Sequence, residues 1–592
     1  MKVVHYFNEN NRVAKVVDGE KSFLLTNKIG GYLWWNSQTT SRYQGWFFVP
    51  DDLVGQKIFR LVESIEIENA PAVEEIKNNF WECEQKRGVI TEKFFLPPFL
   101  DVFSYQISEK ANLTVVLDIK ETYNNQSNNR FYEIFYENGL ILIRYTQPDL
   151  TFPEIWLAIK SDSQETKLVK KWLLKHYAFD RKRNSPPFER YVFSAIKLVA
   201  AQRIIFAASK EKQKVIDCVT YAADNLNVLK KKAQKETKKL SSFFYDPVIK
   251  DPELKMAFLC AKNSLQGLLV FDQKKKAKML YAGLPWFFQP WQRDTALSLK
   301  ALSFVNRSAG QTIFEKMLVA VIKGEKNDSA VDGWGWLFKR SEIFSFKRKF
   351  LLLAIEEFIK NGQINFSKAC FLYHSRTSWM DTVARAPYGL ETQTLLLNAY
   401  QLAQDNYEFW RKKFFYRKQK NKSHKYLREK FWNNEVLADG LFENQIADRT
   451  VRPNVFLAAL AYNKLLSKDE WQRCFENILP HLWLDWGGLA TLDKKNSAFQ
   501  GKHTGEIPLS YHQGDSWFFI NNLAALILAQ NNKKKFNAYI EKILKASAYD
   551  ILWQGIIGHH SELSSANNLL PEGCLCQAWS SAFFLELLKK LY

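Results

Sequence analysis

The apolar pattern of this 592-residue chain changes once, and the change divides it into two kinds of structure. Up to about residue 210, short segments rich in Val, Ile, Phe and Tyr alternate with turn-forming residues, which is typical of β-strands. Many short strands at this spacing predict a β-sandwich of antiparallel sheets over residues 1–212. The clearest segments are 58–67, 94–107, 113–119, 139–145 and 191–208.

Residues 213–244 are rich in Ala, Leu, Lys and Glu, which favour a helix, and we expect a linker helix here. From 245 to 592 the apolar residues recur at three- and four-residue spacing, which indicates helices. Roughly 350 residues leave room for about a dozen of them. The clearest helical segments are 295–304, 391–403, 453–466, 516–530 and 577–591.

Polar and aromatic motifs stand directly before several of these helices. If the helices form a ring, their N-termini meet at one end and the loops there build a single pocket, as in an α/α toroid. The motifs are Trp291-Gln292-Arg293-Asp294, Val451-Arg452-Pro453-Asn454, Tyr511-His512-Gln513-Gly514-Asp515 and Pro571-Glu572-Gly573-Cys574.

A simpler explanation exists for single residues in these motifs. Asp294 and Asp515 stand where helix N-caps stand, and Pro453 stands where a first-turn proline is tolerated. Capping does not account for the Trp and Arg residues around Asp294, so that acid is the better candidate for a site.

Charge and cysteine content give little support to other classes of protein. The net charge is +21, but the lysine runs are scattered and no nucleic-acid-binding motif is present, so no nucleic-acid partner is expected. Seven widely spaced cysteines fit a reducing, cytoplasmic location. No apolar run approaches the roughly 20 residues that cross a bilayer, so no membrane partner is expected. Cys574-x-Cys576 lacks zinc-site spacing, and no metal or other cofactor is expected.

Seven motifs follow one another in one order from residue 25 to residue 580. They are Leu25-Thr26-Asn27-Lys28-Ile29-Gly30-Gly31-Tyr32 with Ser41-Arg42-Tyr43-Gln44-Gly45; Gly283-Leu284-Pro285-Trp286-Phe287; Trp291-Gln292-Arg293-Asp294; Ser378-Trp379-Met380-Asp381; Arg452-Pro453-Asn454; Tyr511-His512-Gln513-Gly514; and Ser561-Glu562-Leu563 with Gly573-Cys574 and Gln577-Ala578-Trp579-Ser580. In this order the motifs resemble those of the glycogen-debranching (amylo-α-1,6-glucosidase) family.

This resemblance implies a β-sandwich followed by an (α/α)6 barrel, the six-hairpin fold of glucoamylase-like glycosidases. It also implies an enzyme that releases the α-1,6-linked glucose left at a branch point of glycogen or limit dextrin. Glycoside hydrolysis needs two carboxyl groups flanking the scissile bond, and an inverting enzyme holds them roughly 6.5–9.5 Å apart to admit a water. By the resemblance, Asp381 is the general acid and Glu562 the general base.

Each of these two roles has a plainer alternative. The apolar neighbours of Asp381, Trp379 and Met380, favour a raised pKa and hence a proton donor, but a salt bridge to Arg385 is the alternative. For Glu562 the alternative is a solvated loop carboxylate.

The remaining predicted site residues serve substrate binding. Arg293 and Asp294 are expected to bind sugar hydroxyls, the guanidinium of Arg293 as a two-pronged donor and the carboxylate of Asp294 as an acceptor. Trp286, Trp291 and Trp379 are candidate stacking walls. The other expected substrate-site residues are Arg385, Glu391, Arg452, Asn454, His512, Gln577 and Trp579.

Two rival functions stay open at this point. One toroid hosts several glycosidase chemistries, so a glucoamylase- or trehalase-like exo-hydrolase is possible. His559 and His560 replace smaller residues of the family pattern near Glu562, which keeps an inactive glucan-binding protein as the other rival.

Overall fold

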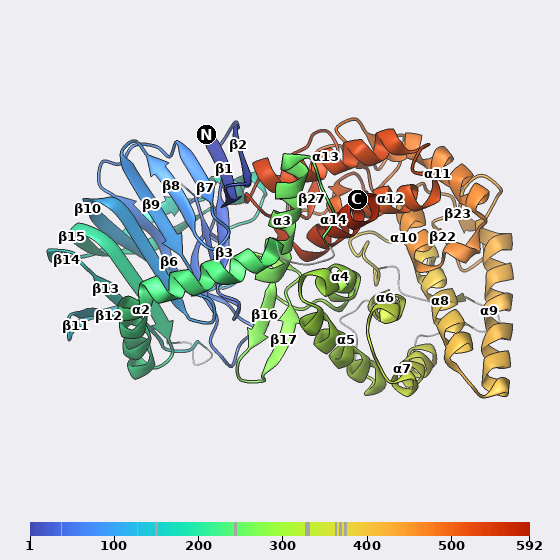
Figure 1. Ribbon diagram of the computed structural model, residues 1–592, viewed down its shortest axis with the longest axis horizontal. Helices are drawn as coiled ribbons and strands as arrows, with labels where there is room; N and C mark the ends of the chain where they lie inside the picture. The colour runs from blue at the N-terminus through green and yellow to red at the C-terminus, as the bar shows by residue number, and fades with distance from the viewer. Residues whose placement is uncertain are drawn as a thin grey trace. The chain divides into compact units, whose positions relative to one another are not determined.

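The computed structural model describes residues 1–36, 38–126, 128–148, 152–241, 246–325, 332–361, 364–365, 370–371 and 376–592. The chain forms two compact units (Figure 1). The first comprises Met1–Gln289 with Ile551–His559, and the second Pro290–Asp550 with His560–Tyr592. The expected borders at 212 and 244 both lie within the first unit, and part of the expected linker, 242–244, lies outside the described residues.

The first unit is a β-sandwich whose two layers share the long strands β10 and β15. One layer has the order β11-β12-β13-β15-β10-β9-β8-β7-β1-β2, and the other runs from β14 through β15, β10, β6, β5 and β4 to β3. Among the described strands of this sheet, every pairing is antiparallel except that of β1 with β7. The strands are β1 Lys2–Asn8, β2 Asn11–Val16, β3 Phe23–Thr26, β4 Tyr32–Trp35, β5 Gly45–Phe48, β6 Phe59–Ile67, β7 Glu75–Asn78, β8 Cys83–Arg87, β9 Ile90–Phe95, β10 Val102–Glu121, β11 Phe131–Glu137, β12 Leu140–Thr146, β13 Ile155–Ser161, β14 Glu165–His176 and β15 Glu189–Ser209.

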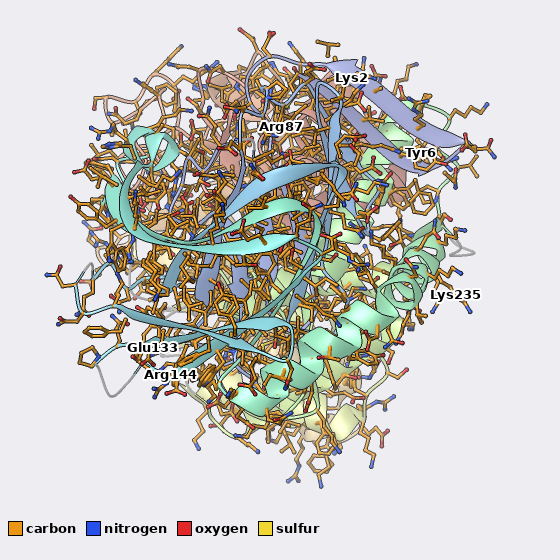
Figure 2. The ribbon with its side chains drawn as sticks, turned by 90° about the vertical axis from the view of Figure 1, so that its left-hand side faces the viewer. Lys2, Tyr6, Arg87, Glu133, Arg144 and Lys235 are labelled. Atoms are coloured by element: carbon orange, nitrogen blue, oxygen red, sulfur yellow. The ribbon has the colours of Figure 1, made fainter. Side chains whose placement is uncertain are left out.

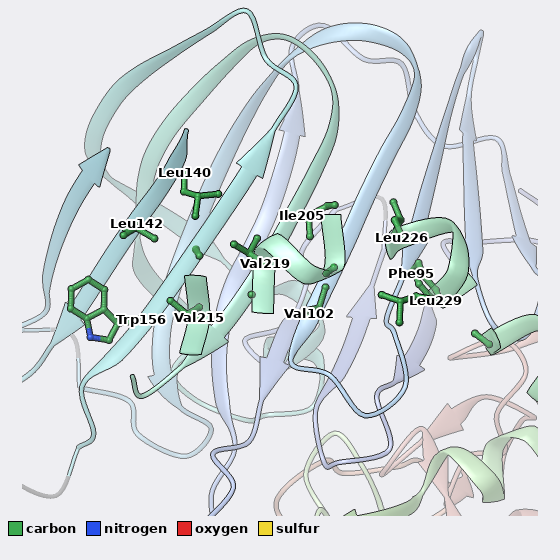
Figure 3. Packing of buried hydrophobic residues seen from close by; sticks show 14 residues of the cluster. Phe95, Val102, Leu140, Leu142, Trp156, Ile205, Val215, Val219, Leu226 and Leu229 are labelled. Atoms are coloured by element: carbon green, nitrogen blue, oxygen red, sulfur yellow. The ribbon is translucent and has the colours of Figure 1, made fainter. Parts of the chain in front are cut away.

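Alternation along β10 and β15 supplies two cores at once. Phe103 and Phe206 face the inside of the sandwich and stack with ring centres 5.4 Å apart. Their neighbours Val102 and Ile205 point to the opposite face, because successive strand residues alternate. There they pack against helix α2, Lys212–Lys238 (Figure 3). The apolar face of α2 repeats every three or four residues, at Val215, Val219, Ala222, Leu226, Leu229 and Ala233. The expected linker helix is therefore packed into the first unit's core.

The outer strands of this unit carry charged side chains on their solvent side. On β11 and β12, Glu133 and Arg144 are register partners and form an ion pair of 3.1 Å (Figure 2). Such charged edges discourage pairing with other chains. The unit also contains α1 Ala178–Lys182, α3 Pro252–Gly267, β16 Leu269–Asp272, β17 Ala277–Leu280 and β18 Gly283–Leu284.

The second unit is a closed ring of inner helices with further helices outside it (Figure 1). The inner helices are α4 Gln292–Val305, α6 Asp332–Lys339, α8 Leu390–Asn406, α10 Asn454–Ala461, α12 Phe518–Asn532 and α14 Ala578–Leu591. Each packs against the next, and α14 packs against α4, which closes the ring. Among the described residues the outer helices of this unit are α5 Arg307–Ile322, α7 Arg348–Asn361, α9 Trp410–Phe431, α11 Lys468–Leu482 and α13 Asn537–Trp553. The predicted sandwich followed by a helical toroid is thus confirmed.

Several local expectations need correction. The strand expected over 94–107 is two strands, because the chain breaks between Phe95 and Val102 at Pro97-Pro98. Asp294 is the third residue of α4, and the N-cap of α12 is Trp517, so neither Asp294 nor Asp515 is a cap. Asp515 instead pairs with His503 Nδ1 at 2.7 Å. Among the described residues, no helix is long and apolar enough to cross a membrane.

Candidate active site

The N-terminal ends of the inner helices carry acids and bases that contact one another. Arg293, in the first turn of α4, lies 3.6 Å from the carboxylate of Asp332, the first residue of α6. Its other terminal nitrogen, Nη2, lies 3.9 Å from Oδ2 of Asp381, in the loop before α8. Oδ1 of Asp381 lies 4.0 Å from Nδ1 of His512, in the loop before α12. The loops leading into four inner helices therefore meet at one place.

A second set of contacts adds the loop before α14. Tyr511, next to His512, donates a 2.5 Å hydrogen bond to Oε1 of Glu562. Gln577, the N-cap of α14, donates a 3.3 Å hydrogen bond to Oδ1 of Asp294. The two acids of the expected pair, Asp381 and Glu562, thus belong to one connected cluster around Tyr511, His512 and Arg293.

Glu562 is held rigidly below the surface. It directly precedes β27 (Leu563–Ser564), the middle strand of a small sheet with β26 (Ser516–Trp517) and β28 (Pro571–Glu572). The backbone N–H of Cys574 donates to Oε2 at 2.8 Å. A Cβ at residue 573 would overlap that oxygen, and the residue has φ of 64°, so both facts require Gly573.

Burial raises the pKa of the Glu562 carboxyl group. The residue is 2% exposed, so the alternative of a solvated loop carboxylate is wrong. Burial raises the pKa of Glu562 to about 7, and the hydrogen bonds from Tyr511 and Cys574 act in the opposite direction. A carboxyl group with a pKa near neutrality is suited to proton transfer.

Asp381 is more open than Glu562. Its side chain is 50% exposed, and loss of hydration on the covered side raises its pKa while Arg293 lowers it. The preceding residues Trp379 and Met380 are buried. Asp381 therefore lies at the surface of the cluster, and the two residues beneath it are buried and apolar.

A buried network of hydrogen bonds and ion pairs holds the loop that carries Trp379 and Asp381. The indole N–H of Trp379 donates to Oδ1 of Asn454 at 2.7 Å, and Nδ2 of Asn454 donates to Asp439 at 2.7 Å. Arg385 makes a two-pronged ion pair with Glu391, at 2.6 and 3.1 Å, and a third contact of 2.8 Å with Asp439. The ion pairs of Arg385 thus run to Glu391 and Asp439, whereas those of Asp381 run to Arg293 and His512. This placement suits Arg385, Glu391 and Asn454 to holding the loop of Asp381.

His512 is also tied down by its neighbours. Its Nδ1 lies 2.7 Å from the hydroxyl of Thr382, and Arg452 donates to its backbone carbonyl at 2.7 Å. Burial lowers the pKa of His512 well below its usual value, so the ring is neutral at physiological pH. Arg452 and His512 therefore connect the loops before α10 and α12 beside Asp381.

The four tryptophans of the expected site differ in exposure. Trp291, at the start of α4, is 37% exposed and presents a ring to solvent. Trp379 and Trp579 are buried, and Trp579 stacks on Phe519 with ring centres 4.1 Å apart. Trp286 belongs to the first unit, where the Arg183 guanidinium lies 3.7 Å from its ring centre. Burial makes Trp379 better suited to supporting Asp381 than to stacking on a sugar.

Three participants were assigned no role from the sequence: Tyr511, Asp332 and Asp439. Tyr511 lies within a recognised motif, but nothing in the motif indicates that it faces Glu562. Asp332 is the first residue of an inner helix, and Arg293 and Asp294 are also in the first turn of one. This shared position could have indicated from the sequence that Asp332 belongs to the site. Asp439 has no sequence signal that we recognise. Among the described residues no cluster of three or more His, Cys, Asp or Glu is arranged to hold a metal ion.

The acids around Arg293 outnumber the cations. Burial raises the pKa of Asp294 to about 7 and that of Asp332 to about 6, although Arg293 lowers both. Buried carboxyl groups that share one cation are costly for folding, and such groups are concentrated at functional sites.

This cost predicts the effect of Asp294→Asn on stability. In the unfolded chain the Asp294 carboxyl ionises near pH 4, whereas the folded protein holds its pKa at about 7. As the pH rises through this window the unfolded chain loses the proton first, so wild type loses up to about 4 kcal/mol of stability. We expect Asp294→Asn to unfold at a higher temperature than wild type at pH 8.5, with a smaller difference at pH 5.

The control for this prediction is Asp485→Asn, at an exposed position of the same unit. Its melting temperature should follow that of wild type at both pH values. A melting temperature of Asp294→Asn that lies below wild type by the same amount at pH 5 and pH 8.5 contradicts the assigned burial cost.

The ring of helices, the preceding sandwich and the acidic cluster at one end of the ring define a glucoamylase-like, six-hairpin glycosidase fold. A bacterial glucoamylase in complex with acarbose superposes with a TM-score of 0.58 over 97% of this chain and 96% of that chain, at 11% identity. A glycosidase in complex with glucose aligns over 58% of this chain and 99% of that one, at 12% identity and a TM-score of 0.42. At these identities the glucoamylase likeness establishes the fold.

The particular family is indicated by residues 357–586, which match the model of the amylo-alpha-1,6-glucosidase family. The match covers less than half of the chain and confirms the predicted resemblance to this family over that segment. The matched segment contains Asp381 and Glu562, whereas Arg293 and Asp294 precede it. No protein with a curated description matches the sequence.

Proposed function

We propose that this protein is an inverting glycoside hydrolase that releases glucose from α-1,6-linked branch stubs of glycogen-like α-glucans. The observation that carries the proposal is the pair of acids in one cluster at the mouth of the helical ring. Glu562 is buried and accepts hydrogen bonds from Tyr511 and Cys574. Asp381 is half exposed, and a buried polar network holds its loop. The amylo-alpha-1,6-glucosidase match supports the choice of bond.

In the proposed mechanism the two acids have opposite tasks. Asp381, protonated, donates its proton to the glycosidic oxygen that leaves with the glucan. Glu562, ionised, takes a proton from a water that attacks the anomeric carbon from the other side of the ring. Arg293 and Asp294 hold hydroxyls of the terminal glucose, and Trp291 supplies an exposed ring for stacking. A branched α-glucan is the proposed partner, and no cofactor takes part.

The proposed roles predict a bell-shaped dependence of rate on pH. Glu562 acts as a base only when ionised, and its ionised fraction rises as the pH increases through its pKa of about 7. Asp381 acts as an acid only when protonated, and its protonated fraction falls as the pH passes its pKa, which burial raises and Arg293 lowers. The rate follows the product of these two fractions, so it falls at both ends of the pH range. Because the Tyr511 hydroxyl stabilises the ionised form of Glu562, Tyr511→Phe should raise the pKa of Glu562 and lower its ionised fraction most at acidic pH.

The measurement is kcat/KM for glucose release between pH 5 and pH 9. Tyr511→Phe should lose more activity at pH 6 than at pH 8.5. Tyr426→Phe, which removes a hydroxyl bonded to Gln445, is the matched control and should keep the wild-type profile. A uniform loss at every pH in Tyr511→Phe contradicts the assignment of Glu562 as the base.

Substrate choice separates this function from its rivals. The experiment compares glucose release from a phosphorylase limit dextrin trimmed to single-glucose stubs with release from maltose and from trehalose. The proposal predicts rapid release from the trimmed dextrin and little from either disaccharide. Preference for maltose or trehalose indicates a glucoamylase- or trehalase-like enzyme. Binding of dextrin without turnover on any substrate indicates an inactive glucan-binding protein.

A cytoplasmic location completes the proposal. It is supported by the cysteines, because none of the six that the structure describes forms a disulfide. Cysteines in the thiol form fit a reducing compartment. Fractionation of the source cells with detection of the protein by antibody tests the location.

A further inference from the structure

Two outer helices of the second unit carry a patch of exposed apolar side chains. The patch, called here the α7–α9 patch, consists of Phe350, Leu353, Phe409, Trp410, Phe414 and Phe415, each 38–66% exposed. Two ion pairs of 2.8 Å hold the helices side by side, Arg348 with Glu408 and Lys412 with Glu356. Arg348 opens α7 and Glu356 lies about two turns further on, and their partners Glu408 and Lys412 flank the start of α9. Phe350 and Leu353 therefore lie on the part of α7 that is next to the start of α9. Clustered exposed apolar side chains of this size mark an interaction surface.

Within α9, the patch residues lie away from the side of the helix that is buried. The residues that α9 buries are Tyr416, Ser423, Leu427 and Phe431, which form one stripe along the helix. Trp410 and Phe414, four residues apart, project from a different side and remain exposed. The residues that α9 buries therefore do not include Trp410 or Phe414.

The surroundings of the patch are strongly cationic. Helix α9 contains ten Lys or Arg residues and one acid, Glu429. Arg411 lies 5.6 Å from the ring centre of Trp410, and Arg417 lies 5.4 Å from that of Phe414. Within the described parts of the chain, no acidic side chain lies at ion-pair distance from Arg411, Lys413, Arg417 or Lys418. These cations and rings are interleaved on one surface.

The charge selects the class of partner. A second copy of this chain, docked through the same surface, would bring like charges together at high cost. A partner with negative charge is favoured. Phe350, Leu353 and Phe409 have no hydrogen-bonding side-chain atoms, so they gain most from a partner that also offers hydrocarbon.

We infer that the α7–α9 patch binds the surface of an anionic phospholipid bilayer. The phosphate layer matches the cations, and the layer beneath it accepts Phe, Leu and Trp side chains. A nucleic-acid strand matches the cations and the rings but leaves Leu353 in water. The sequence predicts no membrane-spanning segment, and binding to a bilayer surface requires none.

The test is co-sedimentation of the full chain with vesicles of phosphatidylcholine, with and without phosphatidylglycerol. Binding is expected only with phosphatidylglycerol and should weaken as salt increases. Each basic residue near an anionic surface contributes roughly 5-fold in affinity. Arg411→Glu with Lys418→Glu should therefore lower vesicle affinity roughly 25-fold or more.

Two matched controls distinguish binding by the patch from binding through the total charge of the protein or through any exposed aromatic ring. Lys231→Glu with Lys232→Glu makes the same change of net charge on the exposed side of α2 and should bind as wild type does. Trp410→Ala should weaken binding, whereas Tyr221→Ala, at another exposed ring, should not. Circular dichroism and thermal unfolding check that each variant is folded.

Several results overturn the inference. One is no binding to vesicles with phosphatidylglycerol, and another is equal binding to both kinds of vesicle. A third is equal loss in the α9 and α2 charge variants, which indicates attraction by total charge alone. A fourth is binding of a single-stranded oligonucleotide that Arg411→Glu with Lys418→Glu abolishes while vesicles stay unbound, which assigns the patch to nucleic acid.

Discussion

Asp381→Asn is expected to lower glucose release from trimmed limit dextrin by roughly 10²–10⁴-fold, the usual contribution of a general acid. The amide cannot protonate the leaving oxygen but has the size of the carboxyl group. Glu562→Gln should cause a loss of the same order, because the amide cannot take a proton from water. The combined variant should lose little more than either one, since the two groups act in one step. Initial rates at saturating dextrin measure these effects.

The control for these variants is Asp485→Asn, which should retain wild-type turnover. Affinity for dextrin, measured by isothermal titration calorimetry with the inactive variants, should stay within a few-fold of wild type because neither substitution changes shape. Wild-type turnover in both Asp381→Asn and Glu562→Gln would remove the proposed mechanism. Loss of turnover together with loss of the folded state would indicate a structural role instead.

The second large effect concerns the buried network under Asp381. Arg385→Met leaves the carboxylate of Glu391 buried without the cation that it contacts, and takes from Asp439 the closer of its two cations, the other being Arg452 at 3.9 Å. Breaking a buried ion pair from one side costs about 3–5 kcal/mol. For a unit of this size we expect the melting temperature to fall by roughly 5–15 °C. Glucose release should also fall, because the loop of Asp381 is held by this network.

Arg411→Met makes the same chemical change on the exposed side of α9 and should leave the melting temperature close to wild type. Thermal unfolding followed by circular dichroism measures both variants. Equal melting temperatures of Arg385→Met, Arg411→Met and wild type would mean that the Arg385 ion pairs contribute no stability.

The order of folds along the chain could be predicted from the sequence because each unit has its own apolar period. The period of two along the strands and of three to four along the helices depends on local geometry alone. The break between Phe95 and Val102 was open to prediction too, since Pro97-Pro98 removes two backbone donors. The packing of α2 against the sandwich was not, because its partners, such as Val102 and Ile205, lie far away in the chain.

The candidate site was predictable only as far as motifs reach. Arg293, Asp294, Asp381 and Glu562 stand in motifs, and the structure brings them into one cluster. The contact between Tyr511 and Glu562 depends on closure of the helical ring, which no local pattern describes.

Asp515 shows how tertiary structure overrides a local signal. The residue looks like a helix cap. However, Ser516 and Trp517 pair with Ser564 and Leu563 in a short sheet, and the helix begins only at Phe518. The same small sheet positions Glu562. The later start of the helix leaves Ser516 and Trp517 available to form that sheet.

The most direct test of the central claim is the anomeric form of the first glucose released, followed by proton NMR within the first minutes of hydrolysis of an α-1,6-linked stub. Attack by a water that Glu562 activates, on the side opposite to Asp381, inverts the configuration. The expected result is that β-glucose appears first and the α-anomer grows in later by mutarotation. Initial release of α-glucose would contradict the proposal, because retention requires a carboxylate that bonds to the sugar itself.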